Sequence, residues 1–148
     1  MSGKLLAIAR REKSRGEMEV LDRTDVSPEA GVAGDLRGRH GERQVTVLSR
    51  EAWDATCATL GIEIPWTTRR ANLLVEGLEL EGTSGQRLRI GAVQLVVTGE
   101  TAPCPRMEQQ HAGLRAALEP AWRGGVTCRV LSGGELRRGD PVFWDETS

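Results

Sequence analysis

The residue whose type and setting could most directly do chemistry is Cys104, which stands between two prolines and two positions before Arg106. A thiolate attacks electrophiles and binds soft metals, and a guanidinium nearby favours the thiolate form. Pro105 biases Cys104 away from the helical region, and Pro103 does the same to Ala102, so we expect an extended, stiff backbone. The sulfur should then lie just past the end of a strand, facing a cavity. Alternatively, the proline pair only ends that strand.

The other two cysteines are expected to be structural. Cys128 alternates with Val126 and Val130 on one face of a β-type run, a pattern typical of a buried strand face. Cys57 follows Trp53 by one helical turn, on the stripe that a helix buries. No cysteine has the C-x-x-C spacing of a zinc site or a redox dithiol, so we expect three reduced thiols.

Two helices are expected to help position these side chains. Ser49 is a typical N-cap and Gly61 a typical C-cap, so the residues between them should form a helix. A second helix is predicted over residues 111–122, shortened or kinked by Pro120. His111 is interpreted as a surface residue at the start of that helix, because Cys104 and His111 alone would make a poor metal site.

Short β-type runs separated by Gly-rich turns make up most of the remaining chain. They begin at Lys4, Met18, Arg43, Ala71, Gln86, Gly124 and Asp140. This pattern predicts a mainly β protein, either a closed antiparallel barrel or a sandwich, with a few short helices. No repeat or linker interrupts the chain, so we expect one domain over residues 1–148. The polar stretches 24–42 and 132–140 are predicted to be a long loop and a turn, and residues 34–44 are either a wall of the functional site or simply flexible.

Composition argues against several classes of protein. The formal net charge of −1 gives no overall positive field for nucleic acid or anionic lipid, and the 3% aromatic content offers no stacking platform for bases. The N-terminal apolar run is too short to span a bilayer and lacks a small-residue cleavage site. We therefore expect a cytoplasmic protein that binds neither nucleic acid nor membranes.

The order of several short motifs resembles the MOSC domain family, named for the C-terminus of molybdenum cofactor sulfurase. From about Leu5 to about Trp144 the chain shows, in succession, "AGD", "RRAN", "GQRLRIG", "APCP", "RGGV" and "RRGDP". Each motif is weak alone, but their succession is specific. The resemblance implies a closed or partly closed β-barrel and a small stand-alone member of bacterial type. It also implies binding of the molybdenum cofactor, a molybdopterin.

The resemblance assigns roles to three residues above all. Cys104 matches the family cysteine, which either ligates molybdenum or carries sulfur, and Arg70 and Asn72 match a pair that lines the cofactor side. A guanidinium suits the phosphate of a pterin cofactor, and an amide can both donate to and accept from its ring edge. Both side chains should share one face of an extended strand. The alternative is that Asn72 caps a turn and Arg70 is a surface charge.

Further positions follow from the same resemblance. Asp35 and His40 resemble a G-D-x-x-x-H type of segment at the cofactor, although four residues separate them here, and His40 either contacts an anion or is solvated. Arg129, which faces opposite to Cys128, could point into or out of the barrel. Pyridoxal phosphate is not expected, because the chain has no aminotransferase-like domain and its two lysines are Lys4 and Lys13. The chain also lacks the N-terminal barrel-like region of the longer reductases in the family. The resemblance therefore does not assign a substrate.

Three functions are compatible with these residues. The first is a cofactor-binding barrel in which the Cys104 thiolate ligates molybdenum and supports a reductase or cofactor-handling reaction. The second is a sulfur carrier that bears a persulfide on Cys104, served by a sulfur-donor or redox protein. The third is a non-catalytic binding barrel with a structural Cys104, which predicts a thiol inert to alkylation until the protein unfolds.

Overall fold

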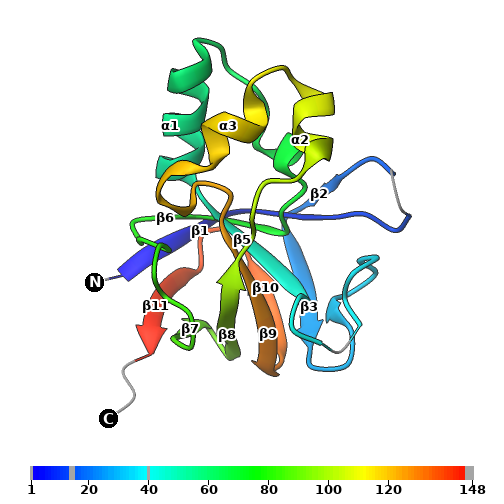
Figure 1. Ribbon diagram of the computed structural model, residues 1–148. Helices are drawn as coiled ribbons and strands as arrows, with labels where there is room; N and C mark the ends of the chain where they lie inside the picture. Colours follow the sequence, from blue (N-terminus) through cyan, green and yellow to red (C-terminus); the bar gives the residue numbers. More distant parts are fainter. Residues whose placement is uncertain (1, 14–15, 40, 146–148) are drawn as a thin grey trace.

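The computed structural model describes residues 2–13, 16–39 and 41–145. Its main feature is a closed ring of seven strands with helices gathered over one end (Figure 1). The ring strands are β1 (Ser2–Arg10), β5 (Val45–Ser49), β6 (Leu73–Glu76), β7 (Arg87–Ile90), β8 (Val93–Glu100), β9 (Val126–Ser132) and β11 (Pro141–Asp145). They pair in the order β11, β7, β8, β9, β5, β6, β1, and β1 pairs back to β11. The predicted β-barrel is therefore confirmed.

One pair in the ring departs from the expected antiparallel pattern. β5 and β6 run parallel, with Val47 opposite Leu73 and Ser49 opposite Val75. Parallel neighbours need a crossover connection, and the helix α1 (Arg50–Leu60) lies in that connection. The crossover places α1 above the end of the barrel, where it packs on α3 (Leu114–Leu118). This arrangement forms a helical cap on one barrel end.

The first predicted helix is confirmed, including its caps. The Ser49 hydroxyl accepts a hydrogen bond from the Ala52 amide at 3.2 Å, and Gly61 takes the left-handed conformation with φ of 71°. Trp53 is buried, and the half-buried Cys57 packs against the same cluster. That cluster joins the cap to the barrel end, with Leu48, Ala71, Leu74, Met107, Leu114 and Leu118 as further members.

The second predicted helix is wrong in its bounds. The structure has α2 (Pro105–Gln110), α3, and short 3-10 helices η1 (Trp66–Arg69) and η2 (Pro120–Trp122). Pro105 and Pro120 each begin a helix, where the missing N–H costs nothing. Gly113, with φ of 87°, separates α2 from α3. His111 therefore lies at the end of α2, not at the start of a helix.

The two stretches predicted to be irregular contain strands. β3 (Arg23–Ser27) overlaps the polar stretch 24–42, β4 (Gly31–Val32) lies in it, and β10 (Gly134–Arg137) lies in 132–140. They form a second sheet in the order β10, β3, β4, which contributes Val26, Val32 and Leu136 to the barrel core. The remaining strand, β2 (Glu19–Leu21), lies in the β-type run predicted from Met18 and pairs antiparallel with β1. In the described parts of the chain, no helix has the length and apolar character needed to cross a bilayer.

The barrel interior is aliphatic and contains Cys128. Leu5, Ile8 and Val130 lie in the same core cluster, and Cys128 is fully buried. The structural interpretation of Cys128 is confirmed. Burial raises the pKa of the Cys128 thiol from its ordinary value of 9.0 to about 12, because the interior disfavours the thiolate.

The buried Cys128 thiol should make stability depend on pH in alkaline solution. Above pH 9 the unfolded chain releases this proton and the folded chain keeps it, so the unfolding free energy should fall until the pH passes about 12. The slope from this one group is about 1.4 kcal/mol per pH unit. Urea unfolding of Cys128→Ala between pH 8 and about pH 10 should show a shallower decline than wild type, and Cys57→Ala should keep it. Equal slopes in all three proteins would contradict the prediction.

Candidate functional site

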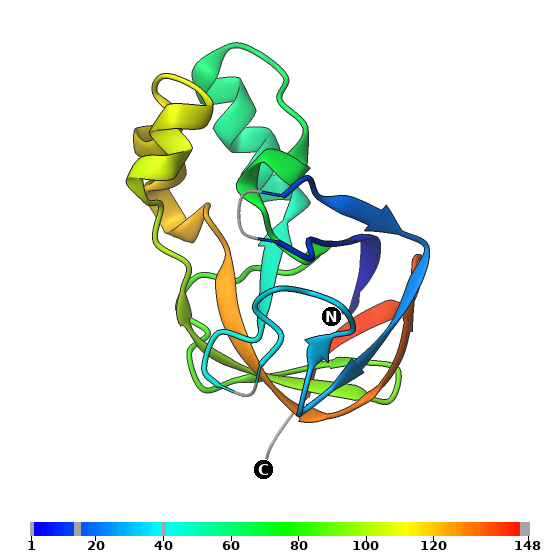
Figure 2. The same cartoon turned by 90° about the vertical axis from the view of Figure 1, so that its right-hand side faces the viewer.

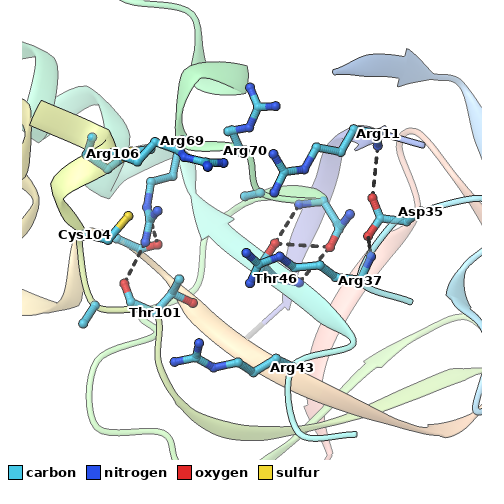
Figure 3. A pocket seen from close by; sticks show the side chains of 15 residues that line it. Arg11, Asp35, Arg37, Arg43, Thr46, Arg69, Arg70, Thr101, Cys104 and Arg106 are labelled. Carbon is cyan, nitrogen blue, oxygen red and sulfur yellow. Dashed lines mark hydrogen bonds between the residues drawn. The ribbon is translucent and has the colours of Figure 1, made fainter. Parts of the chain in front are cut away.

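A cavity of about 370 Å³ opens between the helical cap and the barrel end (Figure 3). Its described lining holds one thiol, Cys104, one carboxylate, Asp35, and six arginines. The arginines come from separate parts of the chain: Arg11, Arg37, Arg43, Arg69, Arg70 and Arg106. A formal net charge of −1 for the whole chain therefore conceals a local concentration of positive charge. We call this cavity the arginine pocket.

Cys104 lines the arginine pocket and is exposed. We call the part of the pocket around its sulfur the thiol end. Cys104 follows the end of β8 and directly precedes α2, with φ of −114° and ψ of 169°. The expected extended backbone at Cys104 is thus confirmed. A thiol at this place can be reached from solvent, which does not fit a cysteine packed into the core.

Arg69 lies beside Cys104 and was missed by the sequence analysis. The residue is only 7% exposed, and its guanidinium donates to the Gly124 carbonyl at 3.1 Å and the Thr101 carbonyl at 2.8 Å. Burial lowers the pKa of Arg69, and the neighbouring Cys104 and Glu100 oppose that change. Arg69 thus fixes the segment that leads from β8 to Cys104. The one available signal was its place in the Arg69–Arg70 doublet.

Arg70 has an unusual backbone conformation. It ends η1 in the left-handed region with φ of 65°, an uncommon conformation for a residue with a side chain. The expectation that Arg70 and Asn72 share one face of an extended strand is therefore wrong, although both line the arginine pocket. One guanidinium nitrogen donates to the Gly16 carbonyl, and the buried Nε has no partner among the described residues. Burial and the neighbouring Arg106 lower the pKa of Arg70.

Asn72 lines the arginine pocket with most of its amide already engaged. Its Oδ1 accepts from the Thr46 amide at 3.0 Å and from the Thr46 hydroxyl at 3.2 Å, and its Nδ2 donates to the Ala9 carbonyl at 3.1 Å. The side chain therefore ties β5 to β1 at the floor of the pocket. One amide N–H stays available to a ligand.

Asp35 positions two of the pocket arginines through their backbones. One carboxylate oxygen accepts from the Arg11 amide at 3.0 Å and the other from the Arg37 amide at 3.2 Å (Figure 3). Arg11 is 8% exposed as a residue, and its Nη1 is buried without a described partner. Burial lowers the pKa of Arg11 most, followed by Arg70, Arg37 and Arg106, and Asp35 opposes them.

Residues 34–39 and 41–44 form one wall of the arginine pocket, because they include Asp35, Arg37 and Arg43. This wall crosses the front of Figure 2 as the cyan loop. Gln44 anchors it with a completely buried side chain, which donates to the Pro28 carbonyl at 2.6 Å and accepts from the Val130 amide at 2.8 Å. The wall is thus attached to the barrel strand β9.

Replacing Gln44 by leucine should destabilise the protein by about 2–3 kcal/mol. The leucine leaves a buried N–H of Val130 and a carbonyl of Pro28 without partners, and each such group costs about 1–3 kcal/mol. Urea unfolding measures the loss. The exposed Gln86→Leu is the matched control and should change stability by less than about 0.5 kcal/mol. A Gln44→Leu protein as stable as this control would contradict the anchoring role.

The remaining candidate residues lie elsewhere. Arg129 is half-buried on β9, opposite Val96, and does not line the arginine pocket. His111 is not in the lining either. His40 lies outside the described residues. No three His, Cys, Asp or Glu side chains come together as a metal site within the described part of the chain.

The hydrogen-bonding groups of the arginine pocket fit an anionic ligand. Three buried side-chain atoms lack a hydrogen-bond partner among the described residues, and all three belong to the pocket lining: Arg11 Nη1, Arg70 Nε and Thr101 Oγ1. Two of them can only donate. Buried donors without acceptors are costly, and the phosphate of a pterin cofactor offers acceptor oxygens. Arg11 and Arg70 therefore suit such a group, and Thr101 lies beside Cys104 (Figure 3).

Comparisons with known proteins agree with this fold. The YUAD protein from Bacillus subtilis is 20% identical, with a TM-score of 0.82 over 96% of this chain and 94% of that one. YiiM from Geobacillus stearothermophilus is 16% identical, with a TM-score of 0.79 over 97% and 75% of the two chains. YiiM from Escherichia coli is also 16% identical, with a TM-score of 0.73 over 98% and 71%.

The family assignment depends on a match over most of the chain. The search of curated proteins finds no match. The family model described as MOSC domain matches residues 24–143, which span β3 to β11 and include every arginine of the pocket except Arg11. The chain belongs to the MOSC domain family.

Proposed function

We propose that the arginine pocket binds the molybdenum cofactor and that the Cys104 thiolate is the protein ligand to the metal. The observation that carries this proposal is the set of unpartnered buried donors on residues that line a cavity, which also holds an exposed thiol. The guanidinium groups supply the positive charge that a phosphorylated ring system needs, and a thiolate is a soft ligand suited to the metal.

Different residues would hold the phosphate and the metal of the cofactor, at two ends of the arginine pocket. Arg11, Arg37 and Arg70 hold the phosphate, and Asn72 uses its remaining amide N–H on the ring edge. Asp35 keeps Arg11 and Arg37 in place through their backbone amides.

The thiol end depends on Arg69. Its hydrogen bonds to Thr101 and Gly124 hold the Cys104 segment, and its positive charge lies beside the sulfur. When bound, the cofactor supplies redox chemistry at the metal; the protein orients it and tunes its electronics.

Metal analysis tests the proposal. Protein made in a host that produces the cofactor should retain molybdenum after purification, and Cys104→Ala should lose it. Cys57→Ala is the matched control, because Cys57 lies on α1 away from the arginine pocket, and it should retain the metal. A wild-type protein without molybdenum, or equal metal in wild type and Cys104→Ala, would overturn the proposal.

The exposure of Cys104 favours sulfur transfer as a second candidate function. The Cys104 thiolate would attack the terminal sulfur of a persulfide on a donor protein. A new S–S bond forms at Cys104, the S–S bond of the donor breaks, and the donor leaves as a thiolate. Mass spectrometry after incubation with a cysteine desulfurase and cysteine should show one added sulfur atom, absent in Cys104→Ser. An unmodified wild type would exclude the carrier.

A further inference from the structure

A second hollow of about 300 Å³ adjoins the arginine pocket. It is lined by Arg70, Arg106, Gln109 and Gln110, and the two arginines line both cavities. Arg106, Gln109 and Gln110 are spaced i, i+3 and i+4 on α2, so they lie on one side of that helix. Because Cys104 precedes α2 directly, the hollow lies next to the thiol end of the arginine pocket.

The charge of this second hollow is not neutralised by the surrounding chain. Arg106 is half-buried and makes no hydrogen bond or ion pair with the described residues. It reaches toward Arg69 and Arg70 in Figure 3. The acid on the same helix, Glu108, is engaged elsewhere, because its carboxylate accepts from the backbone amides of Gly113 and Arg115. The guanidinium of Arg106 thus faces the hollow without a counter-ion from its own helix.

The lining residues define what kind of molecule fits. A guanidinium presents a planar fork of donors that matches a carboxylate or another oxyanion. Gln109 and Gln110 are exposed, and their amides can both donate and accept, so they suit the polar body of such a molecule. Arg106 also lowers the pKa of Arg70, which is consistent with two like charges that lack an anion between them.

We propose that the second hollow binds the anionic group of a small substrate, a carboxylate held by Arg106 with its polar body against Gln109 and Gln110. This inference rests on the proposed function, because it makes the hollow the substrate side of the arginine pocket. The substrate class is a small carboxylate-bearing molecule. Its reacting part would extend from Arg106 toward Cys104.

The test uses benzoate as the probe and benzamide as a neutral molecule of the same shape. NMR spectra of the full chain, labelled at glutamine nitrogen, should show the Gln109 and Gln110 side-chain signals moving with benzoate, with Gln86 unchanged. Benzamide should bind about tenfold more weakly or worse. Arg106→Met should weaken benzoate binding by about tenfold or more, and Arg37→Gln, which alters only the arginine pocket, should leave it within about twofold.

Two outcomes would overturn the inference. One is the absence of benzoate-dependent shifts at Gln109 and Gln110; the other is equal weakening by Arg106→Met and Arg37→Gln, which would place the anion in the arginine pocket. Molybdenum content separates this inference from the proposed function. Gln109→Ala/Gln110→Ala should lose benzoate binding and retain molybdenum, because neither glutamine lines the arginine pocket.

Discussion

Replacing Arg11 and Arg70 together by glutamine is expected to weaken binding of inorganic pyrophosphate by about a hundredfold or more and to stabilise the ligand-free protein. Both residues carry a buried guanidinium nitrogen without a described partner, so an anion in the arginine pocket gains a charge-assisted hydrogen bond from each. Such bonds contribute about 1.5–3 kcal/mol, which is roughly tenfold or more in affinity per arginine.

The same substitutions should stabilise the ligand-free protein, because the two charges are unfavourable when no anion is bound. Burial and nearby arginines lower the pKa of Arg11 and of Arg70, which means that the folded state disfavours both charges. Glutamine removes the charge and keeps a polar side chain, so the unfolding free energy of the ligand-free protein should rise by about 1 kcal/mol. The charges that lower the stability of the ligand-free protein are therefore the ones that bind the anion.

Isothermal titration calorimetry with pyrophosphate and urea unfolding measure the two effects on the same protein. Arg89→Gln is the matched control, because Arg89 is exposed on β7 and does not line the arginine pocket; it should change neither quantity appreciably. Unchanged affinity in Arg11→Gln/Arg70→Gln would show that pyrophosphate does not enter the pocket. A loss of stability would show that the like charges are compensated.

The barrel strands could be predicted because their apolar residues recur over several positions, as in the run that contains Val126, Cys128 and Val130. β3, β4 and β10 could not, because each offers only one buried apolar residue between polar, glycine or alanine neighbours, and pairing with other strands is what orders them. The helix predicted over 111–122 failed for a related reason. The sequence pattern did not show that Pro105 and Pro120 stand at helix starts.

Part of the candidate site could also be predicted from the sequence, and part could not. Cys104 could be singled out because the prolines that stiffen its backbone are its immediate neighbours. The cluster of arginines could not, because its members come from the residue after β1, the loop after β4, the end of η1 and α2, and only the barrel topology brings them together. Net charge gave no signal, because acidic residues elsewhere balance the cluster. The family resemblance identified Arg70 but gave it a strand conformation that the structure does not have.

The wall of the arginine pocket should be most sensitive at Gly38, where alanine is expected to cost about 4 kcal/mol or more and to abolish pyrophosphate binding. A Cβ at Gly38 would overlap the Ala30 carbonyl oxygen, lie 2.8 Å from the Ala30 carbonyl carbon, and lie 3.3 Å from the Asp35 carbonyl oxygen. These are backbone atoms, so the clash can be relieved only by moving the segment that carries Asp35 and Arg37. Stability and binding should therefore fail together.

Gly99→Ala is the matched control for this change, because a Cβ at Gly99 meets nothing within 4 Å. It should melt within a few degrees of wild type and keep its pyrophosphate affinity. Thermal unfolding and calorimetry of the two variants compare the effects directly. If Gly38→Ala melted like Gly99→Ala, the contact between residues 30 and 38 would not support the wall. If it were destabilised but bound pyrophosphate normally, the anion would not depend on Asp35 and Arg37, and the phosphate end of the proposed site would have to lie elsewhere.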